Sequence, residues 1–431
     1  MNKNTPLSKQ PYKGTTDTYP RDMQIREYVF DTWKKVARKF GYEQYDAPLI
    51  EEAKLYKVKS GEELADNQLY SFIDKGGREI ALRPELTPSL ARMIAQKRNE
   101  LTFPIRWFNI GRFYRYEKPQ KGRNREFFQL NIDILGVDNI NAEIEILQFV
   151  LEVMDEFRAP KNSYEIKLSS RYLLDYMFEN ILKIDDSLKL PLSKAIDNYL
   201  KIGKDSFTEY IKDIGLNKEQ SNNLLAFLDW EIEDIRKLKG ENKGIDDLIE
   251  LLERIDELGL TNIIFCPYIV RGLQYYTGIV FEMYDVGSKE NPRSLFGGGR
   301  YDNLLEIFGE EKIPAFGLGW GDITTIEYLS TYSLIPKESA DIDVFITLMD
   351  ESFVDNVFSL AKRLRDSSIK TRVQLTPSKL SKQFKYAAKL NIPWVIVLGE
   401  EEIKNNTVTL KDMGKQEQYQ ISIEEAIKRI G

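Results

Sequence analysis

Residues 112–136 read RFYRYEKPQKGRNREFFQLNIDILG, in which two strand-like runs flank a basic loop. Side chains alternate between the two faces of a strand. In the second run, every second residue from Leu130 to Ile134 is aliphatic. The opposite face carries amide and carboxylate side chains, namely Gln129, Asn131 and Asp133. This alternation is typical of an antiparallel strand with one face in water, and also of a central strand whose polar face lines a pocket.

Further strand-like runs lie at residues 105–117 and 278–284, and both are rich in aromatic or β-branched residues. Turns rather than regular helices separate the runs, which favours a largely antiparallel sheet. The helical spacing of apolar residues predicts helices over about 25–40 and 141–157 that pack on it. The pattern therefore predicts an α+β fold.

The chain divides into three predicted regions. A sheet-rich core occupies residues 1–167 and resumes over residues 261–333. Between these parts, residues 168–260 are rich in Leu, Ile, Lys, Asp and Asn at helical spacing, which predicts a helical insertion. Residues 340–431 alternate strand-like and helical segments, which predicts a small α/β domain with a mixed or parallel sheet.

The composition excludes several kinds of catalysis. The 431 residues include no histidine and one cysteine, Cys266, which rules out a Ser-His-Asp triad, an imidazole base, a histidine metal ligand and an internal disulfide. Charge stabilisation by Arg, Lys and backbone amides, with a hard cation such as Mg²⁺, remains and suits nucleotide chemistry. No apolar run is long enough to span a membrane and the N-terminus lacks a signal-peptide core, so we expect a cytoplasmic protein.

Two basic clusters contrast with the net charge of −7. Residues 112–125 hold six basic side chains and one acidic side chain, and residues 362–389 hold nine basic side chains and one acidic side chain. A single basic run is usually a solvated surface. Two dense clusters in an acidic chain favour a polyanionic partner.

Three further segments carry residues of the kinds that take part in binding or catalysis. LRPELTPSLAR places Glu85 just before Thr87 and Pro88, a pair typical of a helix start. RGLQYYTGIVFEMY begins at Arg271, and FGGGRYDNLL offers three consecutive glycines that allow close backbone approach. Neither a Walker A pattern nor a Rossmann fingerprint occurs, so nucleotide binding requires another scaffold.

Together these strings resemble those of the histidyl-tRNA synthetases, a family of class II aminoacyl-tRNA synthetases. KGTTDTYP resembles the family's first conserved turn, Pro48 resembles the motif 1 proline, and residues 113–129 resemble motif 2. RGLQYYTG and GGGRYD resemble the two histidine-specific motifs, and the segment from Gln374 resembles the anticodon-binding domain. The resemblance implies an antiparallel-sheet class II catalytic core, a helical insertion and a C-terminal α/β anticodon-binding domain.

The resemblance also implies a reaction and its participants. The reaction is the ATP-dependent ligation of L-histidine to tRNA(His) through a histidyl-adenylate, with Mg²⁺ accompanying ATP and no protein-bound transition metal. Members of the family are typically twofold dimers, so we expect a homodimer.

Residue roles follow from the same motifs. The histidine substrate would be bound by Glu85, Thr87, Gln129, Asp133, Tyr275 and Tyr276. ATP would be bound by Arg115, Glu117, Arg123, Arg271 and Arg300. Of these, the catalytic charge stabilisers would be Arg115 and Arg271. The tRNA would contact Lys121, Arg125, Lys382 and Lys385.

Two positions depart from the family pattern. Gln274 replaces the aspartate of the usual RGLDYY, and Asp322, which reads as a helix N-cap, stands where a motif 3 arginine is expected. Either another arginine, Arg123 or Arg300, compensates for that arginine, or ATP binding is weakened. Two alternatives remain open, namely a catalytically idle histidine sensor like the regulatory subunit of ATP phosphoribosyltransferase, and an RNA-binding control module.

Overall fold

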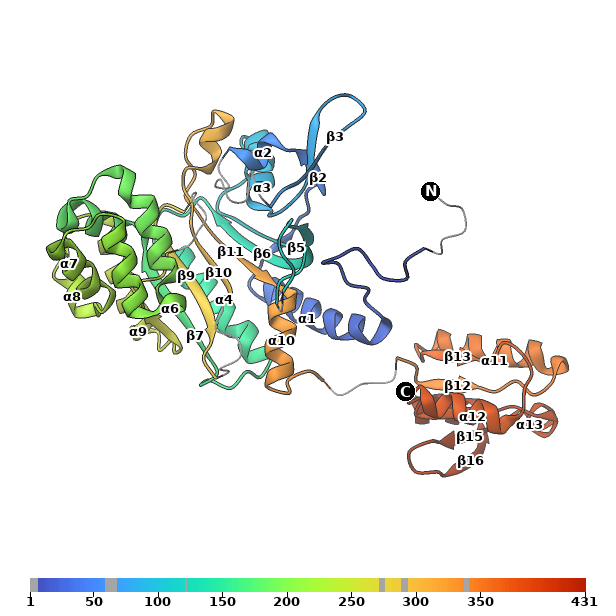
Figure 1. Ribbon diagram of the computed structural model, residues 1–431. Helices are drawn as coiled ribbons and strands as arrows, with labels where there is room; N and C mark the ends of the chain where they lie inside the picture. Colours follow the sequence, from blue (N-terminus) through green and yellow to red (C-terminus); the bar gives the residue numbers. More distant parts are fainter. Residues whose placement is uncertain (1–6, 59–67, 121, 271–275, 288–293, 337–340) are drawn as a thin grey trace. The chain divides into compact units, whose positions relative to one another are not determined.

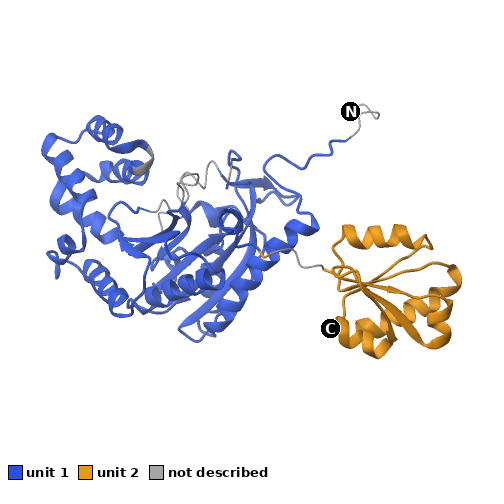
Figure 2. Ribbon diagram, turned by 90° about the horizontal axis from the view of Figure 1, so that it is seen from below, with its two compact units in different colours: residues 1–335 blue, residues 336–431 orange. Residues whose placement is uncertain are grey.

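The structure is a computed structural model of the 431-residue chain. It describes all residues except 1–6, 59–67, 121, 271–275, 288–293 and 337–340, and also leaves the side chains of Leu200 and Lys201 undescribed. The chain forms two compact units, residues 1–335 and residues 336–431 (Figure 2).

The first unit is built on an eight-stranded sheet (Figure 1). In spatial order its strands are β1 (Glu43–Gln44), β5 (Ile105–Tyr114), β6 (Glu126–Leu135), β11 (Ala315–Gly321), β10 (Ser294–Arg300), β9 (Ile279–Asp285), β7 (Tyr164–Ser170) and β8 (Ile263–Phe265). The pairs β1–β5 and β7–β8 are parallel, and all the other neighbours are antiparallel. The predicted α+β fold with a largely antiparallel sheet is confirmed.

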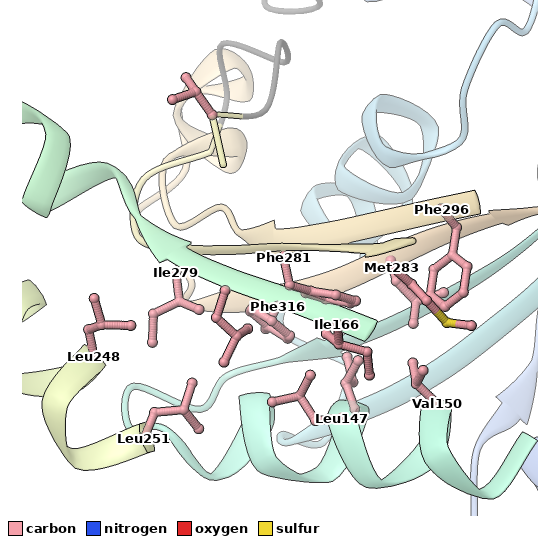
Figure 3. Close-up of a cluster of buried hydrophobic side chains, with 14 of the residues drawn as sticks. Leu147, Val150, Ile166, Leu248, Leu251, Ile279, Phe281, Met283, Phe296 and Phe316 are labelled. Carbon is pink, nitrogen blue, oxygen red and sulfur yellow. The ribbon is translucent and has the colours of Figure 1, made fainter. Parts of the chain in front are cut away.

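One face of this sheet is covered by helices and forms the main core. Helices α1 (Pro20–Lys39) and α4 (Asn141–Glu156) match the two predicted helices, and α9 (Lys243–Glu257) and α10 (Asp322–Thr331) join them. Figure 3 shows strand residues such as Phe281 and Phe316 lying against Leu147 of α4. Because the aliphatic residues of β6 point into this core, Gln129, Asn131 and Asp133 must point to the opposite face.

The segment between β7 and β8 is helical wherever it forms regular structure. It contains α5 (Arg171–Tyr176), the π-helix η2 (Met177–Leu182), α6 (Asp186–Asp213), α7 (Lys218–Leu228), α8 (Ile232–Arg236) and α9. Strand β7 continues to Ser170, so the sheet extends three residues past the predicted core boundary at residue 167. No helix among the described residues is long and apolar enough to cross a membrane.

A small three-stranded sheet lies beside the motif that contains Glu85. Its order is β2 (Ile50–Glu52), β4 (Glu79–Leu82) and β3 (Tyr70–Ile73), with α2 (Lys54–Lys57) and α3 (Thr87–Lys97) next to it in sequence. Helix α3 begins at Thr87 with Leu86 as its N-cap. The predicted helix start is therefore present, and Thr87 is its first residue rather than its cap.

The second unit is a mixed five-stranded sheet with helices, as predicted. The strand order is β13 (Thr371–Val373), β12 (Val344–Ile346), β14 (Trp394–Val397), β15 (Thr407–Asp412) and β16 (Gln418–Ser422). The first three strands are parallel and the last two add in antiparallel fashion. Its α-helices are α11 (Val354–Asp366), α12 (Leu380–Lys389), α13 (Glu400–Asn405) and α14 (Ile423–Ile430).

Candidate functional site

Glycines in two central strands form a floor on the sheet face opposite the main core. A Cβ added to Gly317 would lie 2.2 Å from Asp133 Oδ1, and one added to Gly319 would lie 2.7 Å from Gln129 Nε2. A Cβ added to Gly299 would lie 2.7 Å from a ring carbon of Tyr276. Larger residues would displace these side chains, so the glycines are what allow three predicted histidine-binding residues to lie flat on the sheet.

Asp133 and Tyr276 lie side by side on this floor. Gly299 and Gly317, the glycines beneath them, are register partners in the antiparallel pair β10–β11. Asp133 is buried and accepts a hydrogen bond of 2.5 Å from the Tyr301 hydroxyl. Burial raises the pKa of the Asp133 carboxyl to about 7, although the hydrogen bond from Tyr301 lowers it.

Tyr301 was absent from the predicted set, and the sequence contained a signal for it. It is the tyrosine of GGGRYD, the residue that follows strand β10. Alternation along a strand places residues 299 and 301 on the same face. The string therefore carried enough information to pair Tyr301 with the glycine floor.

A pocket of about 530 Å³ lies over the same face of the sheet. Four of the predicted site residues in and around the β5–β6 loop line it, namely Arg115, Glu117, Arg123 and Gln129. Phe127 lines it as well, and the Arg115 guanidinium lies 5.3 Å from the centre of the Phe127 ring. Arg123 forms an ion pair with Glu117. The pocket thus offers an aromatic face and two guanidinium groups, a combination that suits a nucleotide.

Other parts of the fold complete this pocket. Strand β9 contributes Glu282 and Tyr284, whose hydroxyl donates a 2.5 Å hydrogen bond to Glu282. Helix α6 contributes Ile196 and Asp197, so the helical segment between β7 and β8 forms part of the wall. The sequence analysis missed Ile196 and Asp197 because nothing in the local pattern shows which helix approaches the sheet.

The loop that carries Glu85 is fastened to the strands around it. Glu85 is buried, and the carbonyl of the preceding residue, Pro84, accepts a hydrogen bond of 3.0 Å from Arg115 Nε. The buried Arg83 donates to the Arg112 carbonyl at 2.9 Å and to Asp46 at 2.8 Å. Arg115 therefore links the predicted phosphate site to the loop of the predicted amino-group site.

The prediction that Arg300 binds ATP is wrong. Its side chain is buried in a bidentate ion pair with Glu143 of α4, with both contacts at 2.6 Å, and it donates to the Val137 carbonyl at 3.0 Å. Helix α4 covers the core face of the sheet, so Arg300 points away from the glycine floor. Alternation explains the difference, because the side chain of residue 300 must leave the strand opposite to that of residue 299.

Breaking this buried pair is expected to destabilise the fold. The change Glu143→Ala leaves the Arg300 guanidinium buried without its carboxylate, which typically costs about 3–5 kcal/mol. Urea unfolding measures the loss. Glu152→Ala on the same helix, α4, serves as the control, because Glu152 pairs with Lys39 of α1 at a partly exposed site, where an ion pair contributes little to stability. Equal losses in the two variants would contradict a buried structural role for Arg300.

Asp322 is the first residue of α10, with Gly321 as the N-cap, so the predicted cap is misplaced by one residue. Its carboxylate accepts a hydrogen bond of 3.0 Å from the Phe128 amide and pairs with Arg26 Nε at 3.1 Å. Burial raises the pKa of Asp322, and the Phe128 amide and Arg26 lower it. Asp322 thus joins helices α1 and α10 to strand β6.

The remaining predicted residues fall into three groups. Arg271, Tyr275 and Lys121 lie outside the described residues. Arg125 is stacked 4.2 Å from the centre of the Tyr116 ring and donates to the Glu117 carbonyl at 2.9 Å. In the second unit, Lys382 lines an open groove of about 1090 Å³ together with Arg365, Lys370 and Arg372, whereas Lys385 is exposed on α12 outside the groove lining.

Comparisons with known proteins identify the family. The family model described as Histidyl-tRNA synthetase matches residues 14–321, and the model described as Anticodon binding domain matches residues 343–431. A histidine–tRNA ligase of Leptospira biflexa is 42% identical over 427 residues, which cover 98% of each chain. A histidine–tRNA ligase of Thermoplasma volcanium is 35% identical over 416 residues, 95% of this chain and 96% of the relative.

Solved structures share the fold. The histidyl-tRNA synthetase from Nostoc sp. PCC 7120 aligns with a TM-score of 0.81 at 24% identity, covering 98% of this chain and all of that one. A Bacillus halodurans structure described as an ATP phosphoribosyltransferase regulatory subunit/histidyl-tRNA synthetase aligns with a TM-score of 0.72 at 19% identity, covering 89% of this chain and 97% of that one. At these identities the likeness establishes the fold alone. The family-model match and the near full-length relatives show that the chain belongs to the histidyl-tRNA synthetase family.

Proposed function

We propose that the glycine-floored site activates histidine with ATP and that the activated histidine is then transferred to tRNA. The chain is a ligase that joins histidine to tRNA, as its family membership indicates. The observation that carries the placement of the reaction is the buried Asp133–Tyr301 pair, which lies on the same sheet face as an arginine-containing pocket.

The histidine side chain is recognised at the Asp133 end of the site. An imidazole has one N–H donor and one acceptor nitrogen in its neutral form. The Asp133 carboxylate accepts from the N–H, and the phenol of Tyr276 donates to the other nitrogen. Gln129, Glu85 and Thr87 receive the ammonium group, since a carboxylate, an amide oxygen and a hydroxyl are all acceptors.

Adenylate formation needs charge stabilisation rather than a protein base. A carboxylate oxygen of histidine attacks the α-phosphorus of ATP, the bond to the bridging oxygen breaks, and pyrophosphate leaves with its electron pair. Arg115 and Arg123 bind the phosphate oxygens. Arg271 is assigned the same role only because it lies in the RGLQYYTG motif. Cationic donors placed where negative charge develops are commonly the largest single contribution to such a rate.

The second step transfers the histidyl group to RNA. The oxygen of a terminal ribose hydroxyl of the tRNA bonds to the carbonyl carbon of the adenylate, and the bond from that carbon to the phosphate oxygen breaks. AMP leaves with the electron pair, and the hydroxyl proton passes to one of its phosphate oxygens. Mg²⁺ enters with ATP, because this ion is usually held by substrate phosphates plus one or two carboxylates. Glu117 and Glu282, two of the four carboxylate residues that line the pocket, would hold the ion together with the phosphates.

The groove in the second unit is the proposed contact with the tRNA. Its lining includes Arg365, Lys370, Arg372 and Lys382, which offer positive charge to phosphates, and Tyr386 offers a ring for base stacking. Charge reversal by Lys382→Glu is expected to raise the KM for tRNA and to reduce the salt slope by about 1. Lys385→Glu tests the adjacent position on α12 in the same way.

The matched control for both charge reversals is Lys404→Glu, an exposed change on α13 outside the groove lining. Histidine-dependent pyrophosphate exchange should be unchanged in all three variants, because it needs only the first unit's site. A loss of exchange in the Lys382 or Lys385 variant would show that the second unit supports the fold of the first rather than contacts RNA.

One experiment separates this function from the histidine-sensor alternative. The full chain is assayed for pyrophosphate exchange with ATP, with and without histidine, and for charging of tRNA. Pyrophosphate exchange that depends on histidine supports the first step of the synthetase reaction, and charging of tRNA supports the second. Histidine binding without exchange would favour the sensor. The matched anticodon-binding domain and the near full-length histidine–tRNA ligase relatives argue against that outcome.

We further propose a cytoplasmic homodimer.

A further inference from the structure

The N-terminal segment lies along the basic loop that lines the pocket. The Arg125 amide donates to the Gly14 carbonyl at 2.8 Å, and Asn124 Nδ2 donates to Thr16 Oγ1 at 3.3 Å. A Cβ added to Gly14 would lie 2.7 Å from Arg125 Cδ and 2.9 Å from Pro119 Cγ. The two stretches are about a hundred residues apart in sequence and are in van der Waals contact.

The Arg125 side chain is the main connection between them. Its NH1 donates to the Tyr12 hydroxyl at 3.0 Å, and its guanidinium lies 5.6 Å from the centre of the Tyr12 ring and 4.2 Å from that of Tyr116. Tyr70 packs edge-on against Tyr116, with ring centres 5.2 Å apart. Three tyrosines thus surround one guanidinium, which is an arrangement that cation–π attraction favours.

Arg125 is in turn bonded to the residues of the pocket. Its Nε donates to the Glu117 carbonyl at 2.9 Å, and its own carbonyl accepts from the Arg115 amide at 2.9 Å. The far end of the segment is also fixed, because Arg26 donates to Thr18 Oγ1 at 2.8 Å and pairs with Asp322 at the start of α10. The N-terminal segment is therefore bonded to the β5–β6 loop and, through Arg26, to Asp322, which also lines the pocket.

We propose that residues 12–18 are a strap that holds residues 115–120 and 122–125 in the conformation in which Arg115, Glu117 and Arg123 meet ATP. Arg125 is a positioning residue in this arrangement, in place of the tRNA contact expected from its motif. The inference rests on the proposed function, since it assigns the β5–β6 loop to ATP.

Two substitutions release the strap by different means. Tyr12→Ala removes a hydrogen bond and a ring from Arg125. Gly14→Ala places a Cβ against Arg125 and Pro119 at a residue whose φ is +87°, a region that favours glycine. Each is expected to raise the KM for ATP in pyrophosphate exchange about tenfold. The KM for histidine and the thermal midpoint should stay unchanged, because neither residue belongs to the core or the glycine floor.

Tyr19→Ala is the matched control. Tyr19 is another exposed tyrosine of the same N-terminal segment, and its ring has no described contact with the loop. Hydrogen exchange of the ligand-free protein gives a readout that needs no catalysis. The peptide containing the Arg125 amide should exchange faster in the Tyr12 and Gly14 variants and at the wild-type rate in the Tyr19 variant.

The outcomes separate cleanly. An unchanged rate of hydrogen exchange in that peptide in both variants overturns the strap. Faster hydrogen exchange together with an unchanged KM for ATP overturns it as well. A rise confined to the KM for tRNA in aminoacylation also overturns it, because the segment would then be an RNA contact. If the wild-type protein shows no histidine-dependent pyrophosphate exchange, the proposed function has failed instead. The hydrogen-exchange result still reports on the contact between the strap and the loop.

Discussion

Asp133→Asn is expected to raise the KM for histidine about 100-fold at pH 8. An ionised carboxylate accepting from an imidazole N–H contributes a charge-assisted hydrogen bond, and such bonds contribute about 1.5–3 kcal/mol. The asparagine keeps the shape of the side chain and loses the charge. The KM for ATP should change little, since the proposed phosphate site lies at Arg115 and Arg123. Pyrophosphate exchange at varied histidine and ATP measures both constants, and equal rises in the two would contradict a role in reading the imidazole.

The same substitution is expected to stabilise the ligand-free protein at pH 8. The pKa of Asp133 is about 7 in the folded chain and about 3.9 when unfolded. Between those values the folded state retains a proton that the unfolded state has lost, so this group's contribution to stability falls as pH rises and levels off above pH 7. Asparagine removes that penalty, which amounts to about 2–4 kcal/mol at pH 8 and becomes smaller towards pH 4.

Chemical unfolding at pH 5 and pH 8 measures this effect. The control is Asp31→Asn on α1, an aspartate with a mostly exposed side chain, which should leave the free energy of unfolding nearly unchanged at both pH values. A lower stability of Asp133→Asn at pH 8 would mean that the carboxylate gains more from Tyr301 than it loses by burial. The expected result instead describes a residue retained for binding at a cost in stability.

The alternation of FFQLNIDI was enough to place Gln129 and Asp133 on one face, because the period of a strand is a local property. Alternation could not show whether that face met water or a pocket. That depended on the glycines of β10 and β11, which pair with β9 and β6 through long-range register. The same rule, applied to residues 296–301, would have put Arg300 on the core side. Its assignment to ATP rested on the need to replace the missing motif 3 arginine, and the ion pair with Glu143 contradicts it.

Other features had no local signal. The segment 12–18 is polar and has no apolar period, so nothing in it predicts that Tyr12 meets Arg125. Ile196 and Asp197 of α6 line the pocket together with Glu282 and Tyr284 of β9, and tertiary packing alone brings these residues together. The first residue of α10 shows the limit at a helix end. Asp322 favours a cap position by type, yet its carboxylate turns to Arg26 and the Phe128 amide, partners that only the folded chain supplies.

Arg115→Ala is expected to lower the rate of adenylate formation by about 10²–10³-fold, which is typical of removing one preorganised donor from a developing anion. Arg115 lines the pocket, lies over Phe127 and donates Nε to the Pro84 carbonyl, so part of its fork is fixed before substrate arrives. Arg115→Lys should recover only part of the rate. Lysine supplies a charge, but it lacks the planar fork that can bond to Pro84 and a phosphate together.

Single-turnover formation of the adenylate measures this rate without tRNA. The matched control is Arg112→Ala in β5, three residues before Arg115, where the arginine pairs with Glu126 and stacks on Phe128 outside the pocket lining. That pair is partly exposed, so its loss should cost about 1 kcal/mol of stability or less and leave the rate unchanged. If both variants lost activity equally, the effect would arise from the strand rather than from the phosphate site. A loss confined to Arg115, with lysine intermediate, would place the guanidinium at the reacting phosphorus.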